Sequence, residues 1–389
     1  MEEWKEYKLG DVVNVLDYKR VPLSSKERSL HQGIYPYYGA QGIIDYVDDY
    51  IFDGTYLLIA EDGENLKSKI QNIAQLATGK YWVNNHAHIA ESNGKSDIRF
   101  ICYLLNIMDV SGYITGSAQP KLNQANLLSI SIKLPSLQIQ KSIANFLSVF
   151  DNKIECNRRI NDNLLQQARA LYKSWFVDFE PFKGGKFEDS ELGMIPYGWS
   201  VKQLGKITTQ VNEKVKERVD VKVLSPITTG ELVLSEEYFT KQVFSESISK
   251  YIVVKPFDFA YNPARVNIGS LGMNTFIFDG CVSPVYVVFR CEDNYQYFFD
   301  LFRQTDYFKE EVKTRAIGGV RQTLGYKDFS LIKVVYPPKD IVEKFNKIYS
   351  TLLSKKTKND VENARLGEIR DILLPKLMSG ELKVSEMNV

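Results

Sequence analysis

The chain has 389 residues, enough for two or more domains with sizeable cores, and its 44% hydrophobic and 25% charged residues are ordinary for a globular protein. No apolar run approaches the ~18 residues of a membrane span, no signal peptide is visible, and the four cysteines form no C-x-x-C pair, so a reducing cytoplasm is expected. A net charge of +1 argues against a free-standing, tight DNA binder, because phosphate contacts would need a basic patch or a partner.

The first part of the chain mixes short apolar runs with turns of Gly, Asn and Asp. Tyr56–Ala60 is predicted to be a strand, and "DIRFICYLLNIMDV", which begins at Asp97, is predicted to be a helix. After "GSAQPKLN", which begins at Gly116, Ile130 and Ile132 alternate as a strand would. This part therefore has a mixed α/β character.

A long helix is predicted next, from Gln138 to Asp178. Apolar residues recur there at three- and four-residue steps, namely Ile143, Phe146, Phe150, Ile154, Ile160, Leu164, Ala168, Leu171 and Trp175. Such a helix would be about 60 Å long at ~1.5 Å per residue. Pro181, Gly184, Gly185 and Pro196 interrupt both helix and strand patterns after it, so this stretch is predicted to be a linker.

The same order of sequence motifs then occurs a second time. Trp4 aligns with Trp199 at a separation of 195 positions, and Gly116–Ser136 aligns without a gap with Gly318–Pro338 at 202. In the second copy Tyr286–Arg290 is a predicted strand and "NYQYFFDLFRQTDYFKEEV" a predicted helix. Two copies predict a pseudo-symmetric pair rather than a solenoid.

A second long helix ends the chain, with apolar residues at Phe345, Ile348, Leu352, Leu366, Ile369, Leu373 and Leu377. Pro375 is expected to end or kink it near Leu374, which makes it the shorter of the two. In heptad register, Asn157 and Asn359 occupy the polar midpoint of each run. If the helices pack antiparallel, the two asparagines are expected to face each other and fix register; the alternative is that each points to solvent.

Catalytic motifs are missing from the sequence. "YNPARVN", from Tyr261, has Ala264 where an adenine methyltransferase needs a second proline, and no glycine-rich cofactor or phosphate loop is present. The three histidines and four cysteines show no metal-ligand spacing. His86 or His88 with Glu91 could do acid–base work, but nothing marks a nucleophile beside them.

In its order of motifs, nearly the whole chain resembles the specificity subunits of type I restriction-modification systems. The motifs that carry the resemblance, besides the duplicated Trp…Leu-Gly starts, are "YYGAQGIIDYVDDYIFDGTYLLIAEDG", "YWVNNHAHI", "GSAQPKLN", "LPSLQIQKSIANFLSVFDNKI", "LLQQARALYKSWFVDFEPFKGG", "ELGMIPYGW" and "ILLPKLMSGEL".

The resemblance implies an α+β fold, in which two pseudo-symmetric α/β target recognition domains are separated by two long antiparallel helices that form a coiled coil. The implied divisions are a first recognition domain at 1–135, a central long helix at 136–180, a linker at 181–198, a second recognition domain at 199–337, and a C-terminal long helix and tail at 338–389.

The resemblance also implies a non-catalytic, cytoplasmic reader of double-stranded DNA with no membrane contact. Each recognition domain would read one half of a bipartite, asymmetric site. Two methylation subunits would dock on the chain and carry S-adenosylmethionine, so the chain itself would bind no cofactor and no metal. Restriction subunits would join the full complex.

Candidate DNA contacts lie in turns and glycine-bounded loops. Asparagine and glutamine amides can read adenine, arginine can read guanine, and lysine or a glycine-rich backbone can approach phosphate. The candidates are Tyr38, Gln41, Lys80, Asn84, Asn85, His86, His88, Ser117, Gln119 and Lys121 in the first copy, and Arg265, Asn267, Arg315, Arg321 and Gln322 in the second. The alternatives are internal roles: turn formation for Asn84 and Asn85, packing for Tyr38 and His86, a solvated Lys80, and a salt bridge for Arg265.

The apolar ends of the two helices are candidates for docking the methylation subunits. These residues are Leu171, Trp175, Phe176, Leu373, Leu377 and Met378, and the alternative for them is an intramolecular core. Two other function classes stay open at this point. One is a duplicated scaffold that binds no DNA, and the other is a stand-alone DNA-modifying enzyme, which the missing motifs oppose.

Overall fold

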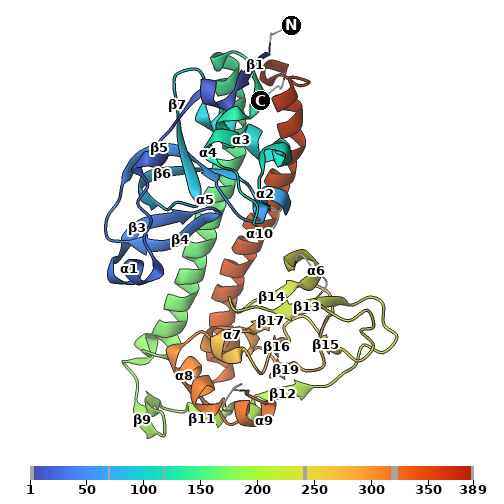
Figure 1. The fold of residues 1–389 in the computed structure, drawn as a ribbon. Coiled ribbons are helices and arrows are strands. Elements are labelled where there is room, and N and C mark those ends of the chain that lie inside the picture. The colour runs from blue at the N-terminus through green and yellow to red at the C-terminus, as the bar shows by residue number, and fades with distance from the viewer. Residues whose placement is uncertain (1–3, 69–70, 117–118, 240–242, 317–322, 387–389) are drawn as a thin grey trace. The chain divides into compact units, whose positions relative to one another are not determined.

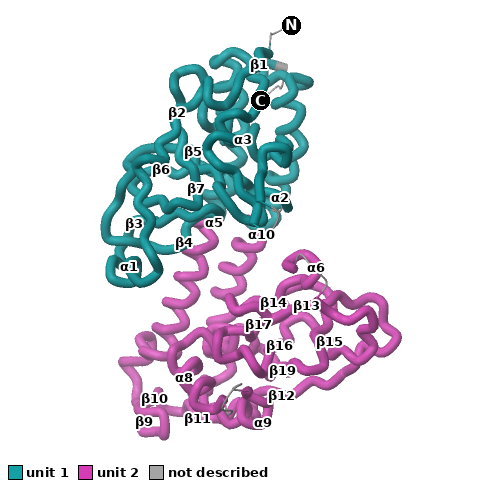
Figure 2. Tube along the Cα trace, viewed as in Figure 1, with its two compact units in different colours: residues 1–158, 360–389 teal, residues 159–359 magenta. Residues whose placement is uncertain are grey.

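The computed structural model describes the chain except for residues 1–3, 69–70, 117–118, 240–242, 317–322 and 387–389. The chain divides into two compact units, which Figure 2 colours separately: unit 1 combines Met1–Arg158 with Asp360–Val389, and unit 2 is Arg159–Asn359. Each unit therefore holds a segment of both long helices. Within the described residues, none of the helices is long and apolar enough to cross a membrane.

Unit 1 is built around a six-stranded sheet of order β2-β7-β5-β6-β3-β4, with a separate β1-β8 pair (Figure 1). Its elements before the long helix are β1 (Lys5–Lys8), η1 (Leu9–Asp11), β2 (Val13–Val15), η2 (Asp17–Lys19), α1 (Ser25–Leu30), β3 (Gln32–Gly39), β4 (Gly42–Val47), β5 (Phe52–Ala60), α2 (Asn65–Ser68), β6 (Ala74–Val83), β7 (Ala87–Ser92), α3 (Ile98–Ile107), η3 (Ser111–Tyr113), α4 (Gln124–Ser129) and β8 (Ser131–Leu134). The predicted strand Tyr56–Ala60 lies within β5, and α3 forms inside the segment predicted to be a helix, whereas of Ile130 and Ile132 only Ile132 lies in a strand, β8. The carboxylate of Asp97 starts α3 by accepting hydrogen bonds from the backbone N–H groups of Arg99 and Phe100.

Unit 2 holds two four-stranded sheets, of order β12-β19-β16-β17 and β14-β13-β18-β15, and the pairs β9-β10 and β11-β20. Its elements between the long helices are η4 (Glu180–Phe182), β9 (Phe187–Ser190), β10 (Gly193–Pro196), β11 (Ser200–Gln203), η5 (Leu204–Lys206), β12 (Thr208–Val211), β13 (Lys222–Pro226), β14 (Leu232–Leu234), α6 (Ser235–Tyr238), β15 (Ile252–Val254), β16 (Phe259–Tyr261), η6 (Val266–Ile268), β17 (Leu271–Met273), β18 (Gly280–Val282), β19 (Val287–Cys291), α7 (Gln296–Phe302), α8 (Asp306–Arg315), α9 (Tyr326–Phe329) and β20 (Lys333–Tyr336).

Two local predictions in unit 2 need correction. The pattern read as one helix forms two, α7 and α8, because the side chain of Thr305 caps α8 by accepting a hydrogen bond from the backbone N–H of Phe308. The stretch predicted to be a linker, 181–198, contains the hairpin β9-β10, whose antiparallel register pairs Phe187 with Pro196.

The internal repeat is present as a shared frame. In unit 1, β1 pairs antiparallel with β8, and the backbone N–H of Leu9 donates to the carbonyl of Ile130 at 2.8 Å. In unit 2, β11 pairs antiparallel with β20, and the N–H of Leu204 donates to the carbonyl of Ile332, again at 2.8 Å. We call this strand pair, with its backbone hydrogen bond, the frame. The frame is the same in both units, whereas the larger sheets beside it differ.

The two long helices are α5 (Leu137–Phe176, 40 residues) and α10 (Lys339–Ser379, 41 residues), and η7 (Val384–Glu386) follows α10. In unit 1, Asp151 of α5 contacts Arg370 of α10, and Asn157, further along α5, contacts Asn363. In unit 2, Asn161 of α5 contacts Asn359 of α10, and further along α5 the ring of Tyr172 lies 6.2 Å from that of Phe345, centroid to centroid. Positions rise along α5 as they fall along α10, so the helix segments of each unit run antiparallel, as predicted.

The prediction that α10 is the shorter helix is wrong. Pro375 lies inside α10, which continues to Ser379. A proline in a helix interior removes one backbone hydrogen bond and is destabilising by ~3 kcal/mol. The three apolar residues around it, Leu374, Leu377 and Met378, are buried in the core of unit 1, and this packing holds the last turn in place.

The expected pairing of Asn157 with Asn359 is also wrong in detail. The amide of Asn157 donates to Asn363 Oδ1 at 2.9 Å and to Glu362 Oε2 at 2.7 Å, whereas the amide of Asn359 donates to Asn161 Oδ1 at 2.8 Å. Asn157 and Asn161 are both buried. A polar layer therefore exists in each helix segment, but each asparagine reaches a partner one turn away because the side chains lie diagonally across the seam.

The helix ends predicted to dock partners belong to the cores of the two units. Phe176, Leu377 and Met378 are buried, and Leu171, Trp175 and Leu373 are half-buried against the same cores. The alternative of an intramolecular core therefore holds for these residues, because each frame needs an apolar helix face to cover its strands.

Candidate nucleic-acid interface

Unit 1 contains a pocket of ≈ 530 Å³ that several predicted residues line. Its lining consists of Arg20, Glu61, Asp62, Asn85, His86, Gln119 and Lys121. Four of these, Asn85, His86, Gln119 and Lys121, were predicted from sequence as DNA contacts. A pocket of this volume and polar character is of the size that accepts small polar groups.

Three backbone segments meet at this pocket. Strand β5 ends at Ala60, and the next residue, Glu61, donates its N–H to the carbonyl of His86 at 2.9 Å. The carbonyl of Glu61 in turn accepts from the N–H of Leu122 at 2.8 Å. The "VNNHAHI" turn and the end of the "GSAQPKLN" loop, far apart in sequence, are thereby held on either side of β5.

Basic side chains contact the acidic side chains of the pocket. Glu61 accepts from Arg20 at 2.7 Å and from Lys121 at 3.2 Å, through different carboxylate oxygens. Burial raises the pKa of Glu61, but Arg20, His88 and Lys121 outweigh that effect and hold its pKa below the usual value. The exposed ring of His86 contacts Asp62 through Nδ1 at 2.7 Å.

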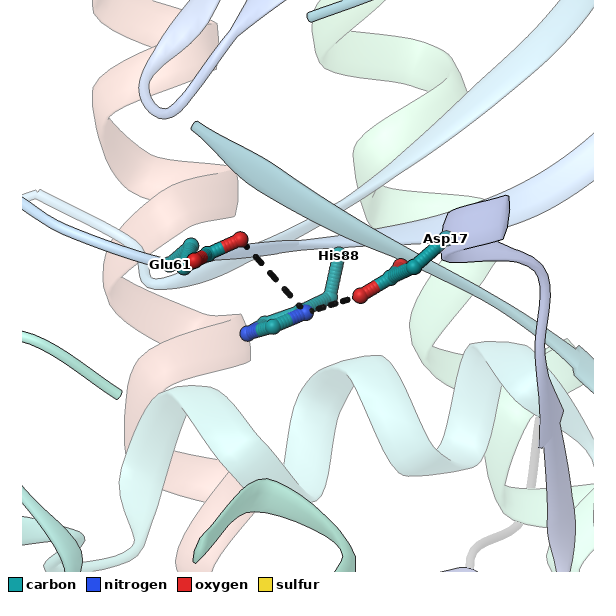
Figure 3. Close-up of side chains that lie close together, drawn as sticks. All are labelled: Asp17, Glu61 and His88. Atoms are coloured by element: carbon teal, nitrogen blue, oxygen red, sulfur yellow. Dashed lines mark hydrogen bonds and ion pairs between the residues drawn. The ribbon is translucent and has the colours of Figure 1, made fainter. Parts of the chain in front are cut away.

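Beneath the pocket, Asp17, Glu61 and His88 point toward one another (Figure 3). His88 is 1% exposed; its Nδ1 lies 2.5 Å from Asp17 Oδ2 and its Nε2 lies 2.7 Å from the carbonyl of Leu122. Both partners are oxygen atoms, so each ring nitrogen makes one contact. His88 therefore ties the loop that ends at Leu122 to η2.

The same three residues have the donor atoms of a metal site, and these atoms lie within 4.8 Å of one another. The residues do not fit a metal ion, because Arg20 already occupies both carboxylates and His88 Nε2 faces a carbonyl. A cation placed there would displace the guanidinium group of Arg20 from both carboxylates. We assign the cluster a structural role.

The remaining first-copy candidates lie in varied surroundings. His88 and Asn84 are buried, and Asn84 Oδ1 accepts from the N–H of His86 at 2.8 Å, so we no longer assign DNA contacts to these two. Tyr38 is half-buried against Tyr81, at 5.3 Å between ring centroids. Gln41, in the turn between β3 and β4, is exposed.

Lys80 and Ser117 complete the first-copy candidates. Lys80 is exposed on β6, with its ammonium 4.6 Å from the ring centroid of Tyr50, and a hydrogen bond to Tyr50 raises the pKa of the lysine. Its role as a phosphate contact stays a prediction. Ser117 lies outside the described residues.

The equivalent loops of unit 2 meet in the same way but carry different side chains. The N–H of Leu324, the counterpart of Leu122, donates to the carbonyl of Pro263 at 3.1 Å, just after β16. Arg265 follows in the same loop and is exposed, and Asn267 is half-buried. Arg315 is held by Glu311 at 2.8 Å within α8. Arg321 and Gln322 lie outside the described residues.

Sequence reasoning missed Arg20, Glu61 and Asp62, which hold the pocket together. A signal for two of them was present, because "EDGE" follows directly on the buried run of β5, and charged residues at the end of a buried strand mark a site edge. Arg20 carries no such signal. Its role depends on the pairing of β2 with β7, which brings η2 beside the end of β5.

Comparison with known proteins gives a consistent result. A family model described as "Type I restriction modification DNA specificity domain" matches residues 1–166. The specificity subunit of the type I restriction enzyme MjaIX of Methanocaldococcus jannaschii is 28% identical over 74% of this chain and 70% of its own length. The HindI specificity subunit of Haemophilus influenzae is 24% identical, over 98% of this chain and 100% of its own length.

A solved structure shares the fold. The crystal structure of the type I restriction-modification S subunit from M. genitalium matches 97% of this chain and 96% of that chain, with a TM-score of 0.59 and 17% sequence identity. At that identity the likeness concerns the fold alone.

Proposed function

The chain belongs to the specificity subunits of type I restriction-modification systems, and from that premise we propose that each unit reads one half of a two-part DNA site. The proposed contact surface is formed by the loops that meet beside Leu122 in unit 1 and beside Leu324 in unit 2. The observation that carries the proposal is the repeated frame with unlike side chains in those loops. Unit 1 presents Asn85 and Gln119 there, and unit 2 presents Arg265. A shared frame that carries different donors suits an asymmetric site.

We extend the proposal to the partners. Because the frame occurs twice, it offers two equivalent surfaces to two copies of the same methylation subunit. In this scheme the methylation subunits hold S-adenosylmethionine and perform the methyl transfer, restriction subunits complete the assembly, and this chain is a non-catalytic subunit. The net charge of +1 fits a reader whose partners supply much of the phosphate contact.

Selection from randomised duplexes with the full chain and its methylation subunits tests the proposal. The expected result is a recognised sequence in two separated parts that differ from each other. Recovery of no preferred sequence would contradict the proposal and favour a scaffold without DNA recognition. Methyl transfer by this chain alone, without the methylation subunits, would contradict its non-catalytic role.

Arg265→Ala is expected to weaken binding to the selected duplex by about 5- to 100-fold, because arginine to guanine is the commonest specific base contact. The loss should concern one base pair in the half read by unit 2, and it is measured by titrating duplexes that differ at single positions. The control is Lys309→Ala, which removes the same charge from an exposed residue of α8 paired with Asp306. An equal loss for every sequence would make Arg265 a phosphate contact instead.

A further inference from the structure

We propose that the pocket of unit 1 is a base-reading site in which the amides of Asn85 and Gln119 recognise the major-groove edge of an adenine. This inference rests on the proposed function and deepens it, since it assigns a base and two side chains to one half of the recognised site. Its basis is a contrast within the pocket. The charged side chains at its floor are paired with one another, whereas the amides of Asn85 and Gln119 are exposed at its rim.

The floor of the pocket is fixed by contacts on every charged group. Arg20 contacts Asp17, Glu61 and the carbonyl of Ala87, at 3.1, 2.7 and 3.0 Å respectively. Lys121 neutralises the second oxygen of Glu61. Because the cations are already paired and two carboxylates lie in the lining, a phosphate gains little from entering the pocket. The floor therefore suits a neutral base edge better than a phosphate.

The rim offers two amides on well-held backbone. Lys121, two residues after Gln119, exchanges two backbone hydrogen bonds with Thr115, both at 2.8 Å. Asn85 lies in the turn between β6 and β7, and its carbonyl accepts from Arg20 at 3.4 Å. Both amides are exposed, and no hydrogen bond of either side chain is found within the described part of the chain. Their donors and acceptors therefore face the pocket and solvent and are available to a ligand.

The chemistry of an amide selects adenine. An amide offers one acceptor and one donor group side by side, which matches the N6 amino group and N7 of adenine in the major groove. Guanine presents two acceptors there, O6 and N7, and is matched by arginine or lysine, but Arg20 is committed to the floor. Asn85 or Gln119 thus forms a bidentate pair, and the other amide is placed to contact the neighbouring base.

The test uses the full chain assembled with its methylation subunits and a duplex that carries the selected sequence. Each adenine in the half read by unit 1 is replaced in turn by 7-deazaadenine, which lacks N7, and by purine, which lacks the amino group. The wild-type complex is expected to lose about 5- to 100-fold in affinity for both analogues at one adenine. If no adenine is sensitive to both replacements, the inference is overturned without recourse to any variant.

The variant Asn85→Ala/Gln119→Ala is expected to bind the unmodified duplex about as weakly as the wild type binds the sensitive analogues, and to lose its discrimination at that adenine. The matched control, Gln138→Ala/Asn152→Ala, removes two exposed amides from α5 in the same unit and should change neither value. Unchanged discrimination by the Asn85/Gln119 variant would contradict the inference while leaving half-site reading intact. Absence of any sequence preference in the wild type would contradict the proposed function itself.

Discussion

Replacing His88 with alanine is expected to lower the free energy of unfolding of unit 1 by about 3 kcal/mol. The ring is buried, and it contacts Asp17 through Nδ1 and the carbonyl of Leu122 through Nε2. Its removal takes away one polar partner of the Asp17 carboxylate and breaks the contact that holds the loop ending at Leu122. Hydrogen exchange followed by mass spectrometry measures the effect locally, with the largest loss of protection expected in β7 and at Leu122.

The control for this prediction is His86→Ala, two residues away. The ring of His86 also contacts a carboxylate, that of Asp62, but it is 49% exposed, and exposed pairs contribute only ~1 kcal/mol or less. A His88→Ala protein as stable as the His86→Ala protein would contradict the structural role given to His88. It would also reopen the question of whether His88 faces DNA, as its sequence motif first suggested.

Phe345→Ala is expected to lower the free energy of unfolding of unit 2 by about 4 kcal/mol, the range found when a buried phenylalanine is truncated. Phe345 is fully buried in α10, and its ring centroid lies 5.0 Å from that of Phe176 and 6.0 Å from that of Trp175. The variant leaves a cavity among these rings. Thermal and urea denaturation measure the change, and hydrogen exchange assigns it to unit 2.

Ile348→Ala serves as the control for Phe345→Ala. Ile348 belongs to the same predicted apolar repeat but is 42% exposed, so its truncation should cost under about 1 kcal/mol. Comparable losses from the two variants would contradict the conclusion that Trp175 and Phe176 face an internal core. In that case, the original interpretation of these rings as a docking surface would regain support.

The sequence allowed the frame of the fold to be predicted because its signals are local and duplicated. Leu204-Gly205 repeats Leu9-Gly10, and both Leu9 and Leu204 make the same backbone hydrogen bond in their units. Heptad spacing identified both long helices to within a few residues. The end of the second helix was misjudged at Pro375, because burial of its neighbours compensates for a local propensity that opposes the helix.

The candidate site could be predicted only in part. The motifs identified the right loops, but sequence could not separate His86, which is exposed, from His88, two residues later, which is buried. That difference depends on η2 covering His88 with Asp17 from the start of the chain. The contribution of Arg20 was equally hidden, since it arises from strand pairing far apart in sequence.

The most direct test of the central claim, that two units read two half-sites independently, is an exchange of residues 1–135 for the matching segment of another specificity subunit. Adenine methylation by the assembled complex is then mapped across a genome. The account predicts that one half of the recognised sequence changes to that of the donor while the other half stays the same. A change in both halves, or in neither, would contradict it.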